Sequence, residues 1–380
     1  MADPVIYLDH QATTPCDAAV VEAMVPWWSE QFANPASRSH RPGLMAAAAV
    51  EQARDQIADS LGVAAGGLVF TSGATEANNL AIKGLAEAEL QAGGQRRHLI
   101  SLATEHQAVL EPLHYLARHG FELTLLPVNP DGLVDLDRLQ AALRDDTLLL
   151  SVMAANNEIG VLQPIETIAR LCRERGIRLH CDAAQAIGHI PFQPTALGID
   201  LLSFSGHKLY GPKGIGALVI APGVELAQQL HGGGQGLRPG TLPVPLIVGL
   251  AKALALALND RDERATRLGA LRDELWQRLE RLDGVHRNGA PAPRLPHNLN
   301  VWIEGLDGNA LQRQLRQRLA VSSGSACSSG APSHVLAALG LKRQQAAAAI
   351  RFGLGRSTNA ATIATAAGVI EQTITALRRS

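Results

Sequence analysis

The sequence predicts an α/β fold built around a mostly parallel β-sheet, and three observations lead to this prediction. Short apolar runs alternate with longer amphipathic stretches through the first two thirds of the chain, as expected for buried parallel strands covered by helices. Polar clusters fall where the apolar runs end. The length of 380 residues, with 46% hydrophobic and 18% charged residues, suits a globular chain of about two domains.

The elements of the larger part follow in chain order. Apolar runs predict strands over Leu68–Phe70, His98–Leu102, Phe121–Leu126, Leu148–Met153, Ile177–Cys181, Leu201–Phe204 and Ile215–Ile220. Amphipathic stretches between them predict helices over Ala74–Leu90, Val109–Arg118 and Ile165–Arg175. Parallel sheets bind ligands outside the carboxyl ends of their strands. The polar clusters at those ends are therefore the candidate functional site.

The pattern changes after about residue 244 and predicts a smaller α+β domain. The expected elements are helices over Val244–Asn259 and Asp260–Leu282, a strand over Asn298–Ile303, a helix over Asn309–Arg318, a Ser/Gly loop, a helix near Val335, a strand near Ile350 and a terminal helix from Asn359. We expect a large domain over residues 16–260. Residues 1–15 and 261–380 are expected to form the small domain, which includes the Ser/Gly loop at 320–332.

Composition excludes several classes of function. The 34 Lys and Arg residues against 35 Asp and Glu give a net charge of −1, which excludes a polybasic nucleic-acid-binding protein. The longest nearly apolar run, Leu246–Leu258, is too short to cross a bilayer, and no signal-peptide pattern opens the chain. No Cys-x-x-Cys pair occurs among Cys16, Cys172, Cys181 and Cys327. We expect a cytoplasmic protein with no metal site, no nucleic-acid partner and no membrane association.

Lys208 is the first candidate for chemistry, because the chain has few lysines and arginine supplies most of its positive charge. It lies in SFSGHKLYGPKGIG (203–216), directly after a predicted strand. A primary amine forms a Schiff base with an aldehyde, which a guanidinium does not. A solvated loop lysine or a phosphate clamp is the alternative, although the spacing does not match a P-loop.

Two further clusters fit a pyridoxal phosphate site. Asp182 ends a predicted strand 26 residues before Lys208, where such an enzyme needs an anion beside the pyridine nitrogen. The segment TSGATEAN (71–78) is a strand-to-helix turn whose free amides and helix dipole suit a phosphate group. The alternatives are an N-cap aspartate and an ordinary helix cap.

Nine segments spread from end to end carry a resemblance. They are YLDHQATTP (7–15), TSGATEANNLAIKG (71–84), TEHQAVLEP (104–112), NNEIGVLQPI (156–165), HCDAAQAIG (180–188), SFSGHKLYGPKGIGAL (203–218), RPGTLPVPLIVG (238–249), AVSSGSACSSG (320–330) and IRFGLGR (350–356). In this order they resemble the NifS/IscS-like cysteine desulfurases, a group of the class V aminotransferase family. SGHK occurs in several pyridoxal phosphate families, whereas its combination with SSGSAC is far more specific.

The resemblance implies a fold type I pyridoxal phosphate enzyme, with a seven-stranded sheet in its large domain, that acts as a homodimer. Lys208 would bind the cofactor and then serve as acid and base. Asp182 would pair with the pyridine nitrogen, Gln185 would bond the ring hydroxyl, and His106 would stack on the ring, unless it is only a helix-start histidine. The phosphate would be held by Ala74, Thr75, Ser205 and His207, and by Thr241 from the partner subunit.

The resemblance also implies the substrate and the nucleophile. Asn157 and Arg351 would bind the carboxylate of L-cysteine, with Arg356 a second candidate, since an arginine fork matches carboxylate geometry. Cys327 would take the sulfur as a persulfide, leave L-alanine, and pass the sulfur to an acceptor protein such as an iron–sulfur scaffold. Its small polar neighbours favour exposure, which a nucleophile needs, over the buried inert state usual for cysteine. The other three cysteines are predicted to be structural members of helices or strands.

Two segments depart from the family pattern. Residues 232–241 and 328–332 are shorter than their counterparts, which affects the predicted phosphate site of the partner subunit and the reach of Cys327. Two alternative functions stay open at this point. One is another pyridoxal phosphate lyase or aminotransferase, such as a selenocysteine lyase. The other is a catalytically silent relative of the same fold.

Overall fold

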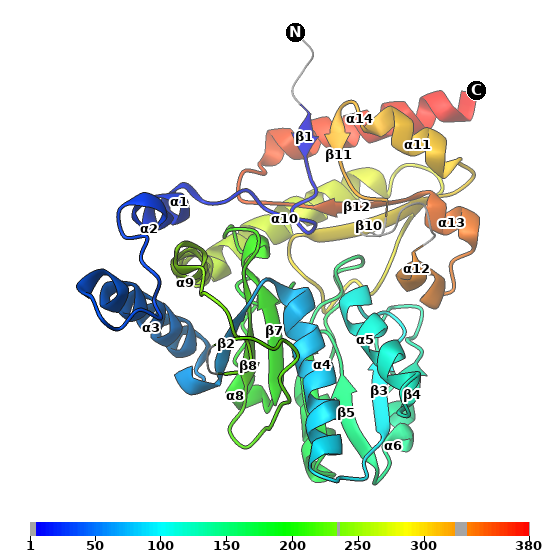
Figure 1. Cartoon of the computed structure of the whole chain (residues 1–380). Coiled ribbons are helices and arrows are strands. Elements are labelled where there is room, and N and C mark those ends of the chain that lie inside the picture. The colour runs from blue at the N-terminus through cyan, green and yellow to red at the C-terminus, as the bar shows by residue number, and fades with distance from the viewer. Residues whose placement is uncertain (1–4, 234–235, 324–332, 380) are drawn as a thin grey trace.

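The computed structural model describes residues 5–233, 236–323 and 333–379, and a seven-stranded sheet forms its larger part (Figure 1). The strands are β2 (Leu68–Thr71), β3 (His98–Leu102), β4 (Glu122–Leu126), β5 (Thr147–Ser151), β6 (Arg178–Asp182), β7 (Leu201–Ser205) and β8 (Gly216–Ile220). Their order is β2-β8-β7-β6-β5-β3-β4. β8 runs antiparallel to β2 and β7, and the other neighbouring strands are parallel, so the predicted mostly parallel sheet is confirmed.

Helices cover both faces of this sheet. One face packs against α3 (Arg41–Leu61), α7 (Ile165–Glu174) and α9 (Val244–Asn259), and the other against α4 (Ala74–Gln91) and α5 (Gln107–Ala117). Successive strand residues alternate between the two cores: Ile100 packs with the α3 side, and Leu99 packs with the α4 side. The shorter helices of this part are α1 (Ala18–Met24), α2 (Pro26–Ser29), α6 (Leu136–Ala142) and α8 (Pro194–Leu197).

A smaller α+β part lies beyond the carboxyl ends of the large sheet (Figure 1). Its elements are α10 (Arg261–Leu279), β9 (Val285–Arg287), β10 (Asn298–Ile303), α11 (Gly308–Leu315), β11 (Leu319–Ala320), α12 (His334–Ala338), α13 (Arg343–Ala347), β12 (Ala349–Gly353) and α14 (Ala360–Arg379). The order β12-β10-β9 forms an antiparallel sheet. The N-terminal strand β1 (Ile6–Tyr7) pairs in parallel with β11, and Leu8 packs in this core. The division into residues 16–260 and residues 1–15 with 261–380 stays a prediction.

The terminal helix α14 is long and apolar enough, by length and composition, to cross a membrane. Its buried side chains, including Ile363, Ala366, Ile370 and Ile374, instead belong to the core of the smaller part. The same helix lies against α10 and α11 (Figure 1). The apolar face of α14 is therefore used in packing within the chain.

The cysteines differ in one respect from the sequence expectation. Cys172 lies in α7 and Cys181 in β6, as predicted, and both are buried. Cys16, however, lies in the loop before α1 and is partly exposed. The prediction that it belongs to a helix or strand is wrong, because Pro15 and the N-cap residue Asp17 delay the start of α1 to residue 18.

Candidate active site

A cavity of about 480 Å³ opens at the carboxyl ends of β2, β5, β6 and β7. Its wall includes ten of the residues selected from the sequence, namely Ala74, Thr75, His106, Asn157, Asp182, Gln185, Ser205, His207, Lys208 and Arg351. These residues come from segments that are far apart in the chain. The sheet brings them together because its parallel strands end along one edge.

Lys208 reaches the cavity from a short 3₁₀ turn, Gly206–Lys208, that directly follows β7. Its Nζ donates a hydrogen bond to the main-chain oxygen of Gln11. The imidazole Nε2 of His189 lies 3.0 Å from the main-chain oxygen of Lys208. The amine is thus held at the junction between the N-terminal segment and the large sheet.

Asp182 ends β6 in the cavity wall, and the residue is 6% exposed. One carboxylate oxygen accepts a hydrogen bond from Asn78 Nδ2 at 2.7 Å, and the other accepts the main-chain N–H of Ala184 at 2.9 Å. These two donors orient the carboxylate, while Gln185 donates from Nε2 to the main-chain oxygen of Gln11 at 3.0 Å. The acidic group is therefore fixed before any ligand binds.

Two histidines in the wall are neutral at neutral pH. His106 begins α5 and accepts the N–H of Ala108 on Nδ1 at 3.1 Å, so the proton of the neutral ring is on Nε2. Burial lowers its pKa. Burial, with Lys208 and Lys213 nearby, lowers the pKa of His207 to about 4. His106 is thus a helix-start histidine that also lines the cavity.

The start of α4 forms an anion-binding cradle. Gly73 is the N-cap residue, has φ 153° and provides no side-chain cap, so the first amides of this 18-residue helix have no capping side chain. Gly216 passes so close that a Cβ there would lie 2.7 Å from Gly73 Cα. The buried Ser205 hydroxyl has no hydrogen-bond partner within the described residues. Free amides, a helix dipole and a hydroxyl suit a phosphate.

Arg351 lies on β12 and is almost fully buried, with 1% of its side chain exposed. Its Nη2 donates to Asp9 at 2.8 Å and to the Ser322 hydroxyl at 3.0 Å. Its Nη1 donates to the main-chain oxygen of Asn157 at 2.9 Å, and Nε has no partner among the residues that the structure covers. A buried guanidinium with donors to spare is suited to bind a carboxylate at the cavity.

Two selected residues lie elsewhere. Thr241 lines a separate hollow with Arg238 and Asn34. Arg356 is outside the cavity wall and pairs with Asp17 and Asp260. Cys327, like the shortened segment 328–332, lies outside the described residues.

The sequence reasoning assigned no role to several wall residues. These are Gln11, Ala12, Thr13, Asn78, Met153 and Lys213. The segment at 7–15 did carry the family resemblance and was the available signal for Gln11. Asn78 lies one helical turn after Ala74, which places it on the same face of α4. That spacing was the available signal for Asn78.

The comparisons with known proteins agree with this geometry. A lysine after β7 and an aspartate at the end of β6 are the two groups that define a pyridoxal phosphate enzyme. The family model "Aminotransferase class-V" matches residues 6–365, so the chain belongs to that family. The curated relative "Cysteine desulfurase IscS" from Edwardsiella ictaluri is 47% identical to it, over 98% of this chain and 93% of the relative.

Solved structures extend the likeness to three dimensions. A "NifS-like protein" matches with a TM-score of 0.92 at 37% identity, covering 98% of this chain and all of the other (100%). A structure titled "SspA in complex with cysteine" matches with a TM-score of 0.80 at 38% identity, covering 92% of this chain and 99% of the other. The fold prediction and the family resemblance are confirmed.

Pyridoxal phosphate is the cofactor of this family and of this chain, and the cavity residues fit it. The uncapped start of α4 and the unpartnered Ser205 hydroxyl suit its phosphate. Asp182 offers an oriented carboxylate for its ring nitrogen, and Lys208 offers the primary amine for its aldehyde. The phosphate, the ring nitrogen and the aldehyde thus each have a complementary group in one cavity.

Proposed function

We propose that this chain is a cysteine desulfurase, which converts L-cysteine to L-alanine and transfers the sulfur to Cys327 as a persulfide. The observation that supports this most directly is the convergence of Lys208, Asp182 and Arg351 on one cavity. The 47% identity to a relative named cysteine desulfurase supports the substrate. Other pyridoxal phosphate activities would use the same lysine and aspartate.

The chain's own residues position the substrate and move its protons. Bound pyridoxal phosphate withdraws electrons from the α-carbon of the amino acid. Arg351 and Asn157 hold the carboxylate, which fixes the orientation of the bond that is broken. The Lys208 amine removes the α-proton and returns protons to carbon. Asp182 would keep a proton on the ring nitrogen, and His106 would stack on the ring.

The sulfur step requires a thiolate. The Cys327 thiolate attacks the substrate sulfur, so that a sulfur–sulfur bond forms and the carbon–sulfur bond breaks. The electron pair of the broken bond stays with the substrate carbon, which takes a proton and becomes the methyl group of alanine. The products are alanine and the Cys327 persulfide, so atoms and electrons balance. The role of Cys327 rests on the segment SSGSAC and the family to which the chain belongs.

Mass spectrometry of the cysteine-treated protein tests the proposal. We expect an adduct with the mass of one sulfur atom on Cys327, removed by a reducing thiol, and no adduct on Cys16, the partly exposed control cysteine. Cys327→Ala should lose alanine release from cysteine while it keeps the absorption band of the bound cofactor. Cys16→Ala should retain both properties.

Measurements on the same proteins distinguish the alternative functions. Normal alanine release by Cys327→Ala, with an intact cofactor band, would indicate another pyridoxal phosphate lyase. A much higher rate with selenocysteine than with cysteine would indicate a selenocysteine lyase. A protein that was offered the cofactor and shows no band would be a silent relative of the fold.

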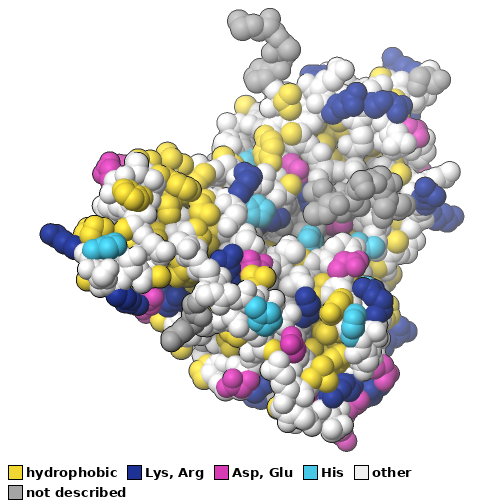
Figure 2. Space-filling view, viewed as in Figure 1, with side chains coloured by type: hydrophobic (Ala, Val, Ile, Leu, Met, Phe, Trp, Pro, Cys, Tyr) yellow, Lys and Arg dark blue, Asp and Glu magenta, His cyan; other side chains and the backbone are white. Residues whose placement is uncertain are grey.

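We propose further that the chain acts as a homodimer. Exposed apolar side chains gather over α1, α2 and the start of α3, visible as the yellow surface at the left of Figure 2. They include Trp28, 59% exposed, and Phe32, 75% exposed. A patch of this kind is typical of a subunit interface. Trp28→Glu with Phe32→Asp should give a monomer by light scattering, whereas Leu90→Glu, on the distant end of α4, should not.

The proposed setting is the cytoplasm, with an iron–sulfur scaffold or another acceptor protein as the receiver of sulfur. Cys16, Cys172 and Cys181 are unpaired, which is typical of a reducing compartment. Transfer of radioactive sulfur from the labelled Cys327 persulfide to an added scaffold protein, without added thiol, would identify that scaffold as the acceptor. Retention of the label on Cys327 would exclude that scaffold.

A further inference from the structure

Tyr210 has the most unusual backbone near the candidate site. It is the one non-glycine residue with positive φ, at 60°, in the part of the chain that the structure describes. It follows Lys208 by two residues, and it is buried, with 6% exposure. Bulky side chains avoid this left-handed region, so the surrounding contacts must hold the residue there. Such strain is often found beside reactive groups.

Contacts from the N-terminal segment fix both sides of the turn that carries Lys208. The N–H of Tyr210 donates to the Thr14 hydroxyl at 2.8 Å, and its carbonyl oxygen accepts the N–H of Asp17 at 2.8 Å. The Thr14 hydroxyl also donates to the main-chain oxygen of His207 at 2.8 Å. The residue before Lys208 and the strained residue after it are thus tied to one threonine.

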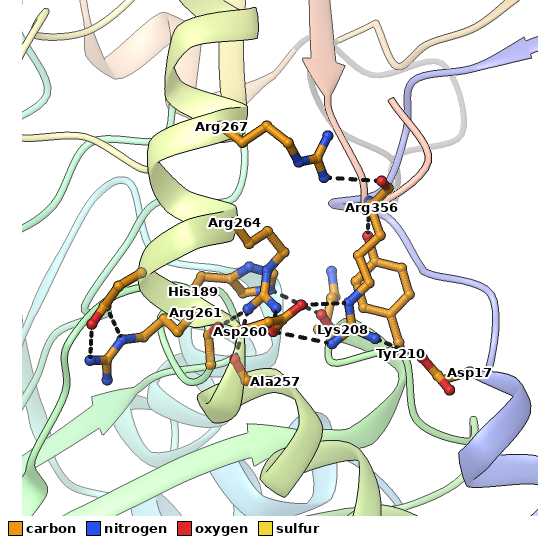
Figure 3. A network of polar contacts seen from close by, with 12 residues as sticks. Asp17, His189, Lys208, Tyr210, Ala257, Asp260, Arg261, Arg264, Arg267 and Arg356 are labelled. Carbon is orange, nitrogen blue, oxygen red and sulfur yellow. Dashed lines mark hydrogen bonds and ion pairs between the residues drawn. The ribbon is translucent and has the colours of Figure 1, made fainter. Parts of the chain in front are cut away.

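Arg356 holds the side chain of the same tyrosine. The phenol oxygen of Tyr210 accepts the main-chain N–H of Arg356 at 2.7 Å, and the guanidinium carbon lies 4.4 Å from the centre of its ring. The guanidinium pairs with Asp17 at 2.8 Å and with Asp260 at 3.3 Å. Figure 3 shows Arg356 with its guanidinium between the two carboxylates and Tyr210 beside it. Its charge is therefore already matched within the chain.

We infer that Arg356 and Tyr210 are positioning residues for Lys208. They hold the strained turn that carries Lys208 in place, and so set the direction from which the Lys208 amine enters the cavity. The same contact fixes the distance between Lys208 and Arg351, since Arg356 follows β12, on which Arg351 lies. This inference rests on the proposed function, in which Lys208 is the reactive amine and Arg351 binds the substrate. It gives Arg356 a role other than carboxylate binding.

The test uses the full-length holoenzyme and four variants. Arg356→Met removes both ion pairs, Arg356→Lys restores a positive charge without the flat guanidinium, and Tyr210→Phe removes only the phenol oxygen. Arg267→Met is the matched control, because it removes a nearby guanidinium whose hydrogen bonds go to the main-chain oxygens of Arg356 and Thr358, while it leaves the Arg356 side chain and the Tyr210 phenol in place. The measurements are the pH titration of the cofactor absorption band, kcat and KM for cysteine, and the melting temperature.

A positioning role predicts a spectroscopic change that lost stability alone does not produce. Arg356→Met should shift the midpoint of the band titration by about half a pH unit or more. Its kcat should fall about tenfold, with KM for cysteine changed by less than about threefold. Tyr210→Phe should show a smaller effect of the same kind, Arg356→Lys a partial recovery, and Arg267→Met no change.

Two results separate this inference from the proposed function. In the first, Arg356→Met lowers only the melting temperature, with a band-titration midpoint and a kcat equal to those of Arg267→Met. The contact between Arg356 and Tyr210 then only stabilises the fold, and the inference is wrong. If no protein in the set releases alanine from cysteine, the proposed function fails. In that case a shifted band in Arg356→Met would still support the positioning of Lys208.

Discussion

Replacement of Arg351 is the sharpest test of how the cavity selects its substrate. Arg351→Met keeps much of the side-chain volume but removes the buried charge that we propose binds the carboxylate. A hydrogen bond to a charged group contributes about 1.5–3 kcal/mol. At about 1.4 kcal/mol per factor of ten, kcat/KM for cysteine should fall roughly 10- to 150-fold.

The same substitution has a separate cost in stability. Arg351 is 1% exposed and Asp9 is 19% exposed, so the variant leaves a mostly buried carboxylate without its partner. Removing one member of a buried pair costs about 3–5 kcal/mol, and the partial exposure of Asp9 favours the lower end, about 3 kcal/mol. For a chain of 380 residues this corresponds to a decrease of roughly 4 °C in melting temperature.

Asp9→Asn separates the two effects. It breaks the same ion pair but keeps the guanidinium, so it should lose comparable stability with KM for cysteine raised by less than about threefold. The double variant should be less destabilised than the sum of the two single variants, because it leaves neither charge unpaired.

Cysteamine, which is cysteine without its carboxylate, completes the assay. Spectral titration of the bound cofactor should show that the parent protein prefers cysteine over cysteamine, and that Arg351→Met loses most of this preference. Two results would refute the reasoning. One is an unchanged preference in Arg351→Met; the other is an equal loss of preference in Asp9→Asn.

Three further predictions follow from single contacts. Ser205→Ala should weaken cofactor binding about tenfold in equilibrium dialysis, while the cofactor-free protein melts no lower, because the hydroxyl has no partner in the described chain. Asp182→Asn should bind the cofactor, as seen by its absorption band, yet lower kcat by roughly 100-fold. His180 is fully buried, and burial lowers its pKa to about 4. As the pH falls, the unfolded state therefore takes up a proton on this residue before the folded state does. The free energy of unfolding should decrease below about pH 6.5, by about 2 kcal/mol at about pH 5. Acid titration followed by circular dichroism should show a shallower loss in His180→Gln, and an equal slope would contradict this assignment.

The strands and the cavity could be predicted from the sequence because their signals are local. Apolar residues are the majority in every strand of the large sheet except β6, and β3 extends over the predicted residues His98–Leu102. The polar residues that end these runs, such as Asp182 and Ser205, must lie along one edge once the strands are parallel. The position of the site could therefore be predicted from two features, the parallel order of the strands and the polar residues at their carboxyl ends.

Other features could not be predicted because their signal is distributed. The sequence did not predict α3, since much of its buried face is alanine, including Ala46 and Ala53, which gives weak periodicity. Strand β1 has only two residues, and its partner β11 is near the other end of the chain. The contacts of Arg356 with Asp17 and Asp260 likewise exist only after the two parts of the chain have packed.

The parallel pairing of Ile6 with Leu319 has a consequence for how the protein matures. A ribosome adds about 5–20 residues per second, so the first strand waits roughly 15–60 s before its partner has been synthesised. Arg351 emerges later still. During that interval Ile6 and Leu8 lack their final burial and are open to chaperones. The residues that we propose hold the cofactor, from Ala74 to Thr241, are all synthesised before Arg351, so the substrate site is completed after the cofactor site.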